Sequence, residues 1–153
     1  MNGDLTQMRR KKIVLIGAGS AVFTRGLVAD LILNPDLGPW MLGLVDIDPK
    51  ALHAADGLAR RMVLAREADI EIEGSTDRRD VLTGADVVVA TVGVGGRRAW
   101  ETDVFIPRKY GVYQPVGDSV MPGGISRAMR MIPALVDVAK DIKVLCPDAL
   151  FVN

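Results

Sequence analysis

Two glycines directly after a strand-like run are the residues in this sequence best suited to binding a phosphate. Residues 12–16 favour a strand, and Gly17-Ala18-Gly19-Ser20 separates them from a helical pattern. Gly17 permits a tight turn, Gly19 lets the backbone approach a pyrophosphate closely, and the first N–H groups of a helix have no partner within it. Val22 replaces the third glycine of the usual fingerprint, so an ordinary turn without a ligand remains the alternative. The residues predicted to bind the dinucleotide here are Gly17, Gly19, Ser20, Ala21, Val22 and Phe23.

Asp46 stands near the end of the next apolar run, which begins at Met41, where a carboxylate can accept hydrogen bonds from an adenosine ribose. Such a contact favours NAD over NADP. Asp46 follows Gly17 at more than the usual ~20 residues, because a helix of ordinary length and a proline-bounded loop intervene. Asp46 or Asp48 could instead cap the next helix. We assign ribose binding to Asp46 and helix capping to Asp48.

Alternating strand and helix patterns predict an α/β fold with a Rossmann-like, doubly wound parallel sheet in the order 3-2-1-4-5. The strand-like runs are residues 12–16, 41–49, 70–73, 86–93 and 149–153, and helical patterns cover 20–33, 51–68, 79–83, 99–110 and 125–141. A complete fold of this type has six strands, and the fifth run coincides with the end of the sequence. We therefore expect a domain truncated after its fifth strand.

We expect two parts: a flexible leader, residues 1–11, and an NAD-binding domain, residues 12–153. In the predicted strand order the sheet reverses direction between its first and fourth strands, where a ligand crevice forms. This switch point places Thr91, Val92 and Gly93 beside the glycine turn, so they are further candidate cofactor-binding residues. The long loop at residues 111–124 lies at the same end of the sheet, where functional residues tend to gather.

The composition excludes several classes of partner and site. The 19 Lys and Arg residues balance the 19 Asp and Glu residues, which argues against nucleic acid and against a membrane surface as partners. No apolar run reaches the ~20 residues of a membrane span. Basic residues 9–12 before an apolar run resemble a signal peptide, but the glycine turn interrupts that run. The single cysteine, Cys146, excludes an intramolecular disulfide and suits a reducing compartment, so we expect a cytoplasmic protein.

Several spaced motifs after Gly93 resemble those of one family. They are Ile106-Pro107-Arg108-Lys109-Tyr110-Gly111, Gln114-Pro115-Val116-Gly117-Asp118-Ser119, Pro122-Gly123-Gly124-Ile125-Ser126-Arg127-Ala128, Ile132-Pro133, and Cys146-Pro147-Asp148-Ala149 with Asn153. Together with the glycine turn and Asp46-x-Asp48, they are similar to the N-terminal part of the NAD-dependent glycoside hydrolases of family 4, particularly the α-galactosidase and α-glucosidase branch. Met121 differs from that pattern, which has a glycine at this position.

The resemblance implies a reaction that depends on NAD and Mn²⁺. NAD⁺ takes a hydride from C3 of the sugar, a tyrosine base removes the C2 proton, and the glycosidic oxygen leaves by elimination; water then adds and the hydride returns. The metal polarises the C2 and C3 oxygens. By the same resemblance, Asp118 tunes the tyrosine base and Asn153 holds sugar hydroxyls. The tyrosine and the metal ligands are expected beyond residue 153, with none of the ligands in this chain, and Cys146 is interpreted as a buried thiol.

Trp100 stands where phospho-sugar members of that family carry an arginine for the 6-phosphate, so we expect a small unphosphorylated glycoside as substrate. Arg97 and Arg98 lie close enough in the sequence to bind a phosphate, so a phosphorylated glycoside is the alternative substrate. One alternative function is a 2-hydroxyacid dehydrogenase of the lactate or malate type, which shares Gly84-Ala85-Asp86. Another is a non-catalytic NAD-binding module. The unprotected strand at the edge of the sheet also predicts a homo-oligomer.

Overall fold

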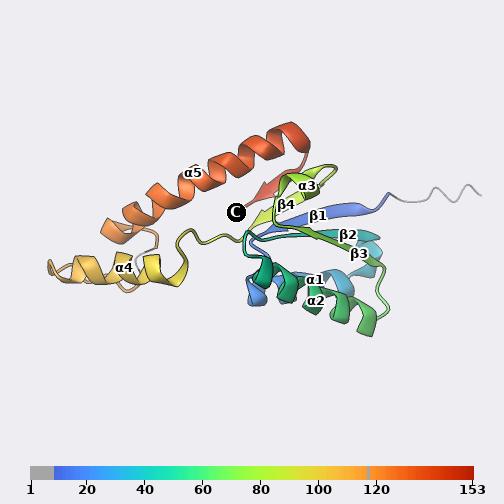
Figure 1. Ribbon diagram of the computed structural model, residues 1–153, viewed down its shortest axis with the longest axis horizontal. Helices are drawn as coiled ribbons and strands as arrows, with labels where there is room; N and C mark the ends of the chain where they lie inside the picture. The colour runs from blue at the N-terminus through green and yellow to red at the C-terminus, as the bar shows by residue number, and fades with distance from the viewer. Residues whose placement is uncertain (1–8, 117) are drawn as a thin grey trace, which may run out of the picture. The chain divides into compact units, whose positions relative to one another are not determined.

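The computed structural model describes residues 9–116 and 118–153 and contains one sheet of five strands in the order β3-β2-β1-β4-β5 (Figure 1). The strands are β1 (Lys11–Ile16), β2 (Trp40–Val45), β3 (Ile70–Ser75), β4 (Val87–Ala90) and β5 (Leu150–Val152). Every neighbouring pair is parallel, which confirms the predicted fold class and strand order. Of the leader predicted at residues 1–11, residues 1–8 lie outside the described residues, and Lys11 is already the first residue of β1.

The helices divide between two compact units. They are α1 (Ala21–Leu33), α2 (Pro49–Ala65), α3 (Arg79–Leu82), α4 (Gly96–Arg108) and α5 (Met121–Leu145), with a 3-10 turn η1 (Pro35–Leu37). The first unit contains the residues up to Thr91 together with 141–153, and the second contains residues 92–140. α5 therefore contributes to both units. Among the described residues, no helix combines the length and the apolar character that a membrane crossing requires.

The core of the first unit lies on both faces of the sheet. α1 and α2 cover one face, and α3 lies against the other (Figure 1). Leu15, Leu42 and Leu44 are fully buried on the side of α1 and α2. On the side of α3, Gly43 leaves room for the side chain of Val81. Continuous apolar strands of this kind are typical of parallel sheets covered on both faces.

Two local predictions in the first unit are confirmed. The Asp48 carboxylate accepts hydrogen bonds from the N–H groups of Lys50 at 2.8 Å and Ala51 at 3.4 Å, and so caps α2. Cys146 lies between α5 and β5 with 5% of its surface exposed, and this burial raises the pKa of its thiol.

Several predicted bounds differ from the observed ones by three or four residues: β2 ends at Val45 rather than at residue 49, and α5 ends at Leu145 rather than at residue 141. The starts of α4 and α5 also differ. α4 begins at Gly96 rather than at residue 99, and α5 begins at Met121 rather than at residue 125. Pro-Gly-Gly is typical of a loop, but proline lacks only an N–H that the first turn of a helix leaves unpaired anyway. Gly124 also belongs to that turn because a Cβ there would lie 2.7 Å from the Ser119 backbone. The loop is therefore shorter than predicted.

Candidate cofactor and substrate sites

The glycine turn joins β1 to α1 and packs against the end of β4. Gly17 has a φ of +95°, a conformation that favours glycine, and its N–H donates to the Val45 carbonyl at 2.8 Å. Thr91 Oγ1 donates to the Gly17 carbonyl at 3.1 Å, and a Cβ at position 17 would lie 2.9 Å from the Thr91 backbone. The structure thus brings Gly17 and Thr91 together at the carboxyl ends of β1 and β4.

The first turn of α1 presents unpaired N–H donors after this turn. Ser20 is the N-cap residue, but its side chain makes no capping hydrogen bond. Within the described part of the chain, no acceptor contacts the backbone N–H groups of Ala21, Val22 or Phe23. The side chains of Val22 and Phe23 are 75% and 61% exposed. Unpaired amides at a helix N-terminus attract phosphate oxygens, so these residues fit the diphosphate of a dinucleotide.

Asp46 lies at the end of β2 and contacts the glycine turn directly. Its Oδ2 accepts a hydrogen bond from the Gly19 N–H at 2.7 Å, and its Oδ1 accepts one from the Asp48 N–H at 2.9 Å. A Cβ at Gly19 would lie 2.7 Å from both Asp46 Oδ2 and Ala51 Cβ, so only glycine leaves room for this contact. The carboxylate is held beside the turn by backbone donors, which is a geometry that suits a ribose contact. Ribose binding by Asp46 remains a prediction.

Replacing Asp46 by alanine should lower the affinity for NAD⁺ about tenfold, since a hydrogen bond to a charged acceptor contributes about 1.5–3 kcal/mol. Affinity for NADP⁺ should change less, because the carboxylate contributes no favourable contact to a 2′-phosphate. Calorimetric titration with both dinucleotides measures the ratio of the NAD⁺ affinity to the NADP⁺ affinity. Asp48→Ala is the matched control, because it removes the cap of α2 and should leave the ratio unchanged. An equal loss for both dinucleotides in Asp46→Ala would argue against ribose recognition.

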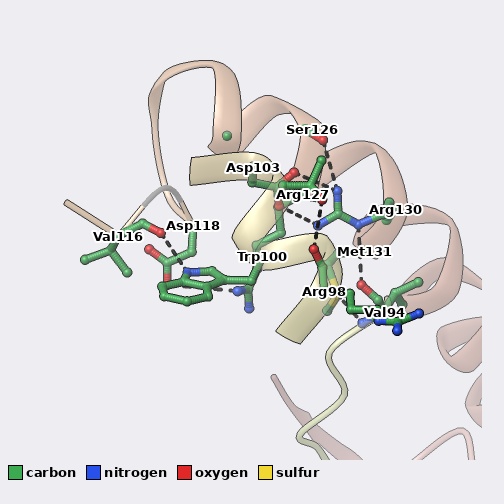
Figure 2. A network of polar contacts seen from close by, with 12 residues as sticks. Val94, Arg98, Trp100, Asp103, Val116, Asp118, Ser126, Arg127, Arg130 and Met131 are labelled. Carbon is green, nitrogen blue, oxygen red and sulfur yellow. Dashed lines mark hydrogen bonds and ion pairs between the residues drawn. The ribbon is translucent and has the colours of Figure 1, made fainter. Parts of the chain in front are cut away.

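The second unit contains a cavity of about 310 Å³ between α4 and α5. Trp100 lines it, and the indole Nε1–H donates to the Val116 carbonyl at 2.8 Å (Figure 2). The other lining residues are Gly93, Val94, Gly96, Arg97, Asp103, Arg127, Arg130 and Met131. A flat aromatic surface beside several polar groups suits a polar ring of sugar size.

Each of the three arginines that line this cavity has a carboxylate partner. Arg130 forms two hydrogen bonds with Asp103, at 3.0 and 2.6 Å, and another with Ser126 Oγ at 3.0 Å (Figure 2). Arg97 pairs with Glu101 at 2.8 Å, and Arg127 lies 4.0 Å from Asp118. The Asp103 side chain is only 3% exposed. Its hydrogen bonds with Arg130 hold the pKa of Asp103 below its ordinary value.

The predicted site residues are divided between the two units. Asp118, Val92 and Gly93 belong to the second unit, whereas Asn153 is exposed after β5 in the first. The catalytic role of Asp118 and the sugar contact of Asn153 remain predictions.

Sequence reasoning missed two buried polar side chains of the second unit, Asp103 and Gln114, which are 4% and 2% exposed. The available signal was weak: Asp103 precedes the apolar run Val104-Phe105-Ile106, and Gln114 stands between Tyr113 and Pro115.

Met121 adopts a left-handed backbone with a φ of +65°, at the position where the resembling family has glycine. A side chain at such a φ costs about 1–2 kcal/mol relative to a right-handed backbone. Met121→Gly should therefore raise the stability of the second unit by about 0.5–1 kcal/mol, after the greater freedom of glycine in the unfolded chain is subtracted. Urea unfolding followed by circular dichroism measures the change. Met129→Gly, in the interior of α5, is the control and should destabilise.

The sequence and the fold both match glycoside hydrolases. A model of the family 4 glycosyl hydrolases matches residues 12–153. The chain is 38% identical to an α-galactosidase of Bacillus subtilis (strain 168) over 144 residues, which cover 94% of this chain and 33% of that protein. It is 37% identical to an α-glucosidase of Erwinia rhapontici, over 93% of this chain and 32% of the relative. The chain thus spans about a third of the length of these relatives.

Solved structures share the fold of this chain. A 6-phospho-β-glucosidase of Thermotoga maritima, crystallised with manganese, NAD⁺ and glucose-6-phosphate, superposes with a TM-score of 0.82 at 24% identity, over 92% of this chain and 33% of that one. A malate dehydrogenase of Cryptosporidium parvum gives a TM-score of 0.60 at 21% identity, over 94% and 37% of the two chains. At these identities the likeness shows the fold alone. The family match over residues 12–153 decides the assignment: the chain belongs to the family 4 glycosyl hydrolases.

Proposed function

We propose that this chain forms the NAD-binding, N-terminal part of an NAD- and Mn²⁺-dependent glycosidase of the α-galactosidase or α-glucosidase type. The observation that carries the proposal is the first turn of α1. Its unpaired amides follow a turn in which Gly17 and Gly19 are both required by close contacts, and the Asp46 carboxylate lies against that turn. This set of donors and acceptors matches the diphosphate and ribose of NAD.

In this proposal, bound NAD⁺ supplies reversible oxidation at C3 of the sugar, which makes the C2 proton acidic enough for elimination. The residues of this chain bind and orient the reactants. The first turn of α1 holds the dinucleotide, Gly19 lets the backbone approach its diphosphate, and Asn153 holds sugar hydroxyls. Asp118 raises the basicity of the tyrosine that removes the C2 proton. Among the described residues, no group of three or more His, Cys, Asp or Glu side chains could hold a metal ion.

The substrate proposed is an unphosphorylated glycoside. The arginines that line the cavity, Arg97, Arg127 and Arg130, each have a carboxylate within 4.0 Å, which weakens their attraction for a phosphate. Arg98 is not among the lining residues, and it keeps a phosphorylated glycoside as the alternative substrate. Trp100 offers the cavity an aromatic surface instead of a guanidinium. These observations support a neutral sugar in the cavity of the second unit.

The test is a hydrolysis assay of the complete gene product with nitrophenyl α-galactoside and α-glucoside, and with their 6-phosphorylated forms. We expect cleavage of an unphosphorylated substrate that requires added NAD⁺ and Mn²⁺. Cleavage of the 6-phosphorylated forms alone would overturn the substrate assignment. Net oxidation of lactate or malate, without glycoside cleavage, would favour a dehydrogenase.

For the 153 residues alone, we propose a narrower activity, which is NAD binding without glycoside cleavage. The chain spans about a third of the length of its relatives. Turnover of a nitrophenyl glycoside by this chain would contradict the narrower proposal. Self-association through the exposed edge of β5 also remains a prediction, which sedimentation velocity would test.

A further inference from the structure

Gln114 is a buried polar residue that belongs to neither the proposed NAD site nor the proposed sugar site. It is 2% exposed and lies in the segment between α4 and α5. Its Nε2 donates a hydrogen bond to the Asp103 carbonyl at 3.0 Å, and its Oε1 accepts one from the Gly123 N–H at 3.3 Å. One side-chain amide thus joins the backbone of α4 to the backbone of α5.

Both of these backbone groups lack a partner within their own helices. The carbonyl of Asp103 would ordinarily accept a hydrogen bond from the N–H four residues later in α4, but that residue is Pro107, which has none. The N–H of Gly123 belongs to the first turn of α5, where no carbonyl precedes it in the helix. Gln114 is therefore the residue that satisfies a carbonyl freed by Pro107 and an amide freed by the start of α5.

The groups that reach the cavity follow Gln114 closely in the sequence. Val116 accepts the hydrogen bond from the Trp100 indole, and Asp118 lies 4.0 Å from Arg127. Both Trp100 and Arg127 line the cavity. Fixing Gln114 between the two helices consequently limits where Val116, two residues later, can lie.

We propose that Gln114 is a positioning residue, whose buried amide joins α4 to α5 and thereby sets the nearby Val116 carbonyl, the acceptor of the Trp100 indole, beside the cavity. The importance of this placement for a glycoside rests on the proposed function. The placement itself does not, because it concerns only contacts within the second unit.

The experiment is hydrogen exchange of the two tryptophan indole N–H groups, followed by NMR in this chain without NAD or glycoside. Trp100 reports the hydrogen bond to Val116, and Trp40, in the first unit, is the internal reference. Gln114→Met keeps the length of the side chain and removes both hydrogen bonds. It should speed exchange of the Trp100 indole about tenfold and leave Trp40 unchanged.

Gln114→Glu is the second variant, and its effect should depend on pH. When ionised, the carboxylate cannot donate to the Asp103 carbonyl, and exchange at Trp100 should be about tenfold faster than in the wild type at pH 8. When protonated, its O–H can donate as the glutamine does, so the ratio to wild type should fall to about one near pH 5, since burial raises the pKa of such a carboxyl. Asp103 stays ionised across this range because Arg130 lowers its pKa.

Tyr113→Ala is the matched control, because this neighbour is 77% exposed. It should leave both indole rates unchanged. The proposal is overturned if folded Gln114→Met exchanges at the wild-type rate, or if the ratio for Gln114→Glu is the same at both pH values. A Gln114→Met variant that fails to fold leaves the pH ratio of Gln114→Glu as the deciding result. Failure of the glycosidase assay would not alter these rates, so the two proposals can fail separately.

Discussion

Replacing Asp103 with asparagine should lower the free energy of unfolding of the second unit by about 1.5–3 kcal/mol, the contribution expected of hydrogen bonds to a charged group. The Asp103 side chain is 3% exposed, and it receives two hydrogen bonds from Arg130. Arg130 itself is 27% exposed, so water can partly solvate its guanidinium once the carboxylate is gone. That solvation keeps the expected loss within this range.

The same ion pair predicts a pH dependence. Arg130 lowers the pKa of Asp103 in the folded chain, so the folded state binds this proton less readily than the unfolded state does. The stabilisation is therefore complete at pH values above the ordinary carboxyl pKa of about 4, and it is lost as the pH falls through the lowered folded value. Asp103→Asn should lack this part of the acid sensitivity.

Urea unfolding followed by Trp100 fluorescence, in a Trp40→Phe background, measures both effects. Asp137→Asn is the matched control, since Asp137 pairs with Lys140 on the surface of α5 at side-chain exposures of 62% and 72%. An exposed pair of this kind contributes only about 0–1 kcal/mol. If Asp103→Asn and Asp137→Asn lose the same free energy of unfolding, the buried pair stabilises the second unit no more than an exposed pair does.

Gly17→Ala should reduce NAD⁺ affinity at least about a hundredfold, because displacing amides that contact a diphosphate removes several charge-assisted hydrogen bonds. The new Cβ would lie 2.9 Å from the Thr91 backbone, and alanine is also strained at the φ of +95° that Gly17 adopts. The end of β1 must therefore shift away from β4, and the first turn of α1 shifts with it.

Gly26→Ala is the control for this variant. Gly26 lies in the same helix, α1, and a Cβ there would have no atom within 4 Å. That substitution should raise stability by about 0.5–1 kcal/mol through helix propensity and leave NAD⁺ affinity unchanged. Calorimetric titration of both variants makes the comparison, with circular dichroism to establish that each remains folded. If folded Gly17→Ala binds NAD⁺ with wild-type affinity, the glycine turn is not part of the NAD site.

The parts of this structure that sequence reasoning predicts well are those fixed by local periodicity. Unbroken apolar runs identify β1 and β4, and helical patterns between strands imply right-handed crossovers, from which the order 3-2-1-4-5 follows. The cap of α2 could be predicted because Asp48-Pro49 carries its own chemistry. Each of these features depends on neighbours in the sequence.

The features that could not be predicted depend on contacts between distant residues. Arg130 pairs with Asp103 across 27 positions, and nothing in the local sequence of either residue identifies the other. The start of α5 at Met121 is another example, because Pro122-Gly123-Gly124 resembles a loop until the close contact of Gly124 with Ser119 is known. Gln114 likewise gains its role only when α4 and α5 are both in place.

The central claim is that the first turn of α1 holds the diphosphate of NAD, and an NMR titration of this chain with NAD⁺ tests it most directly. We predict saturable shifts that are largest at the unpaired backbone amides of Ala21, Val22 and Phe23, with smaller shifts at Gly19 and Ser20, whose N–H groups already donate to Asp46 and to the Gly17 carbonyl. A folded chain whose amide signals at these positions stay unchanged at saturating NAD⁺ would contradict the claim.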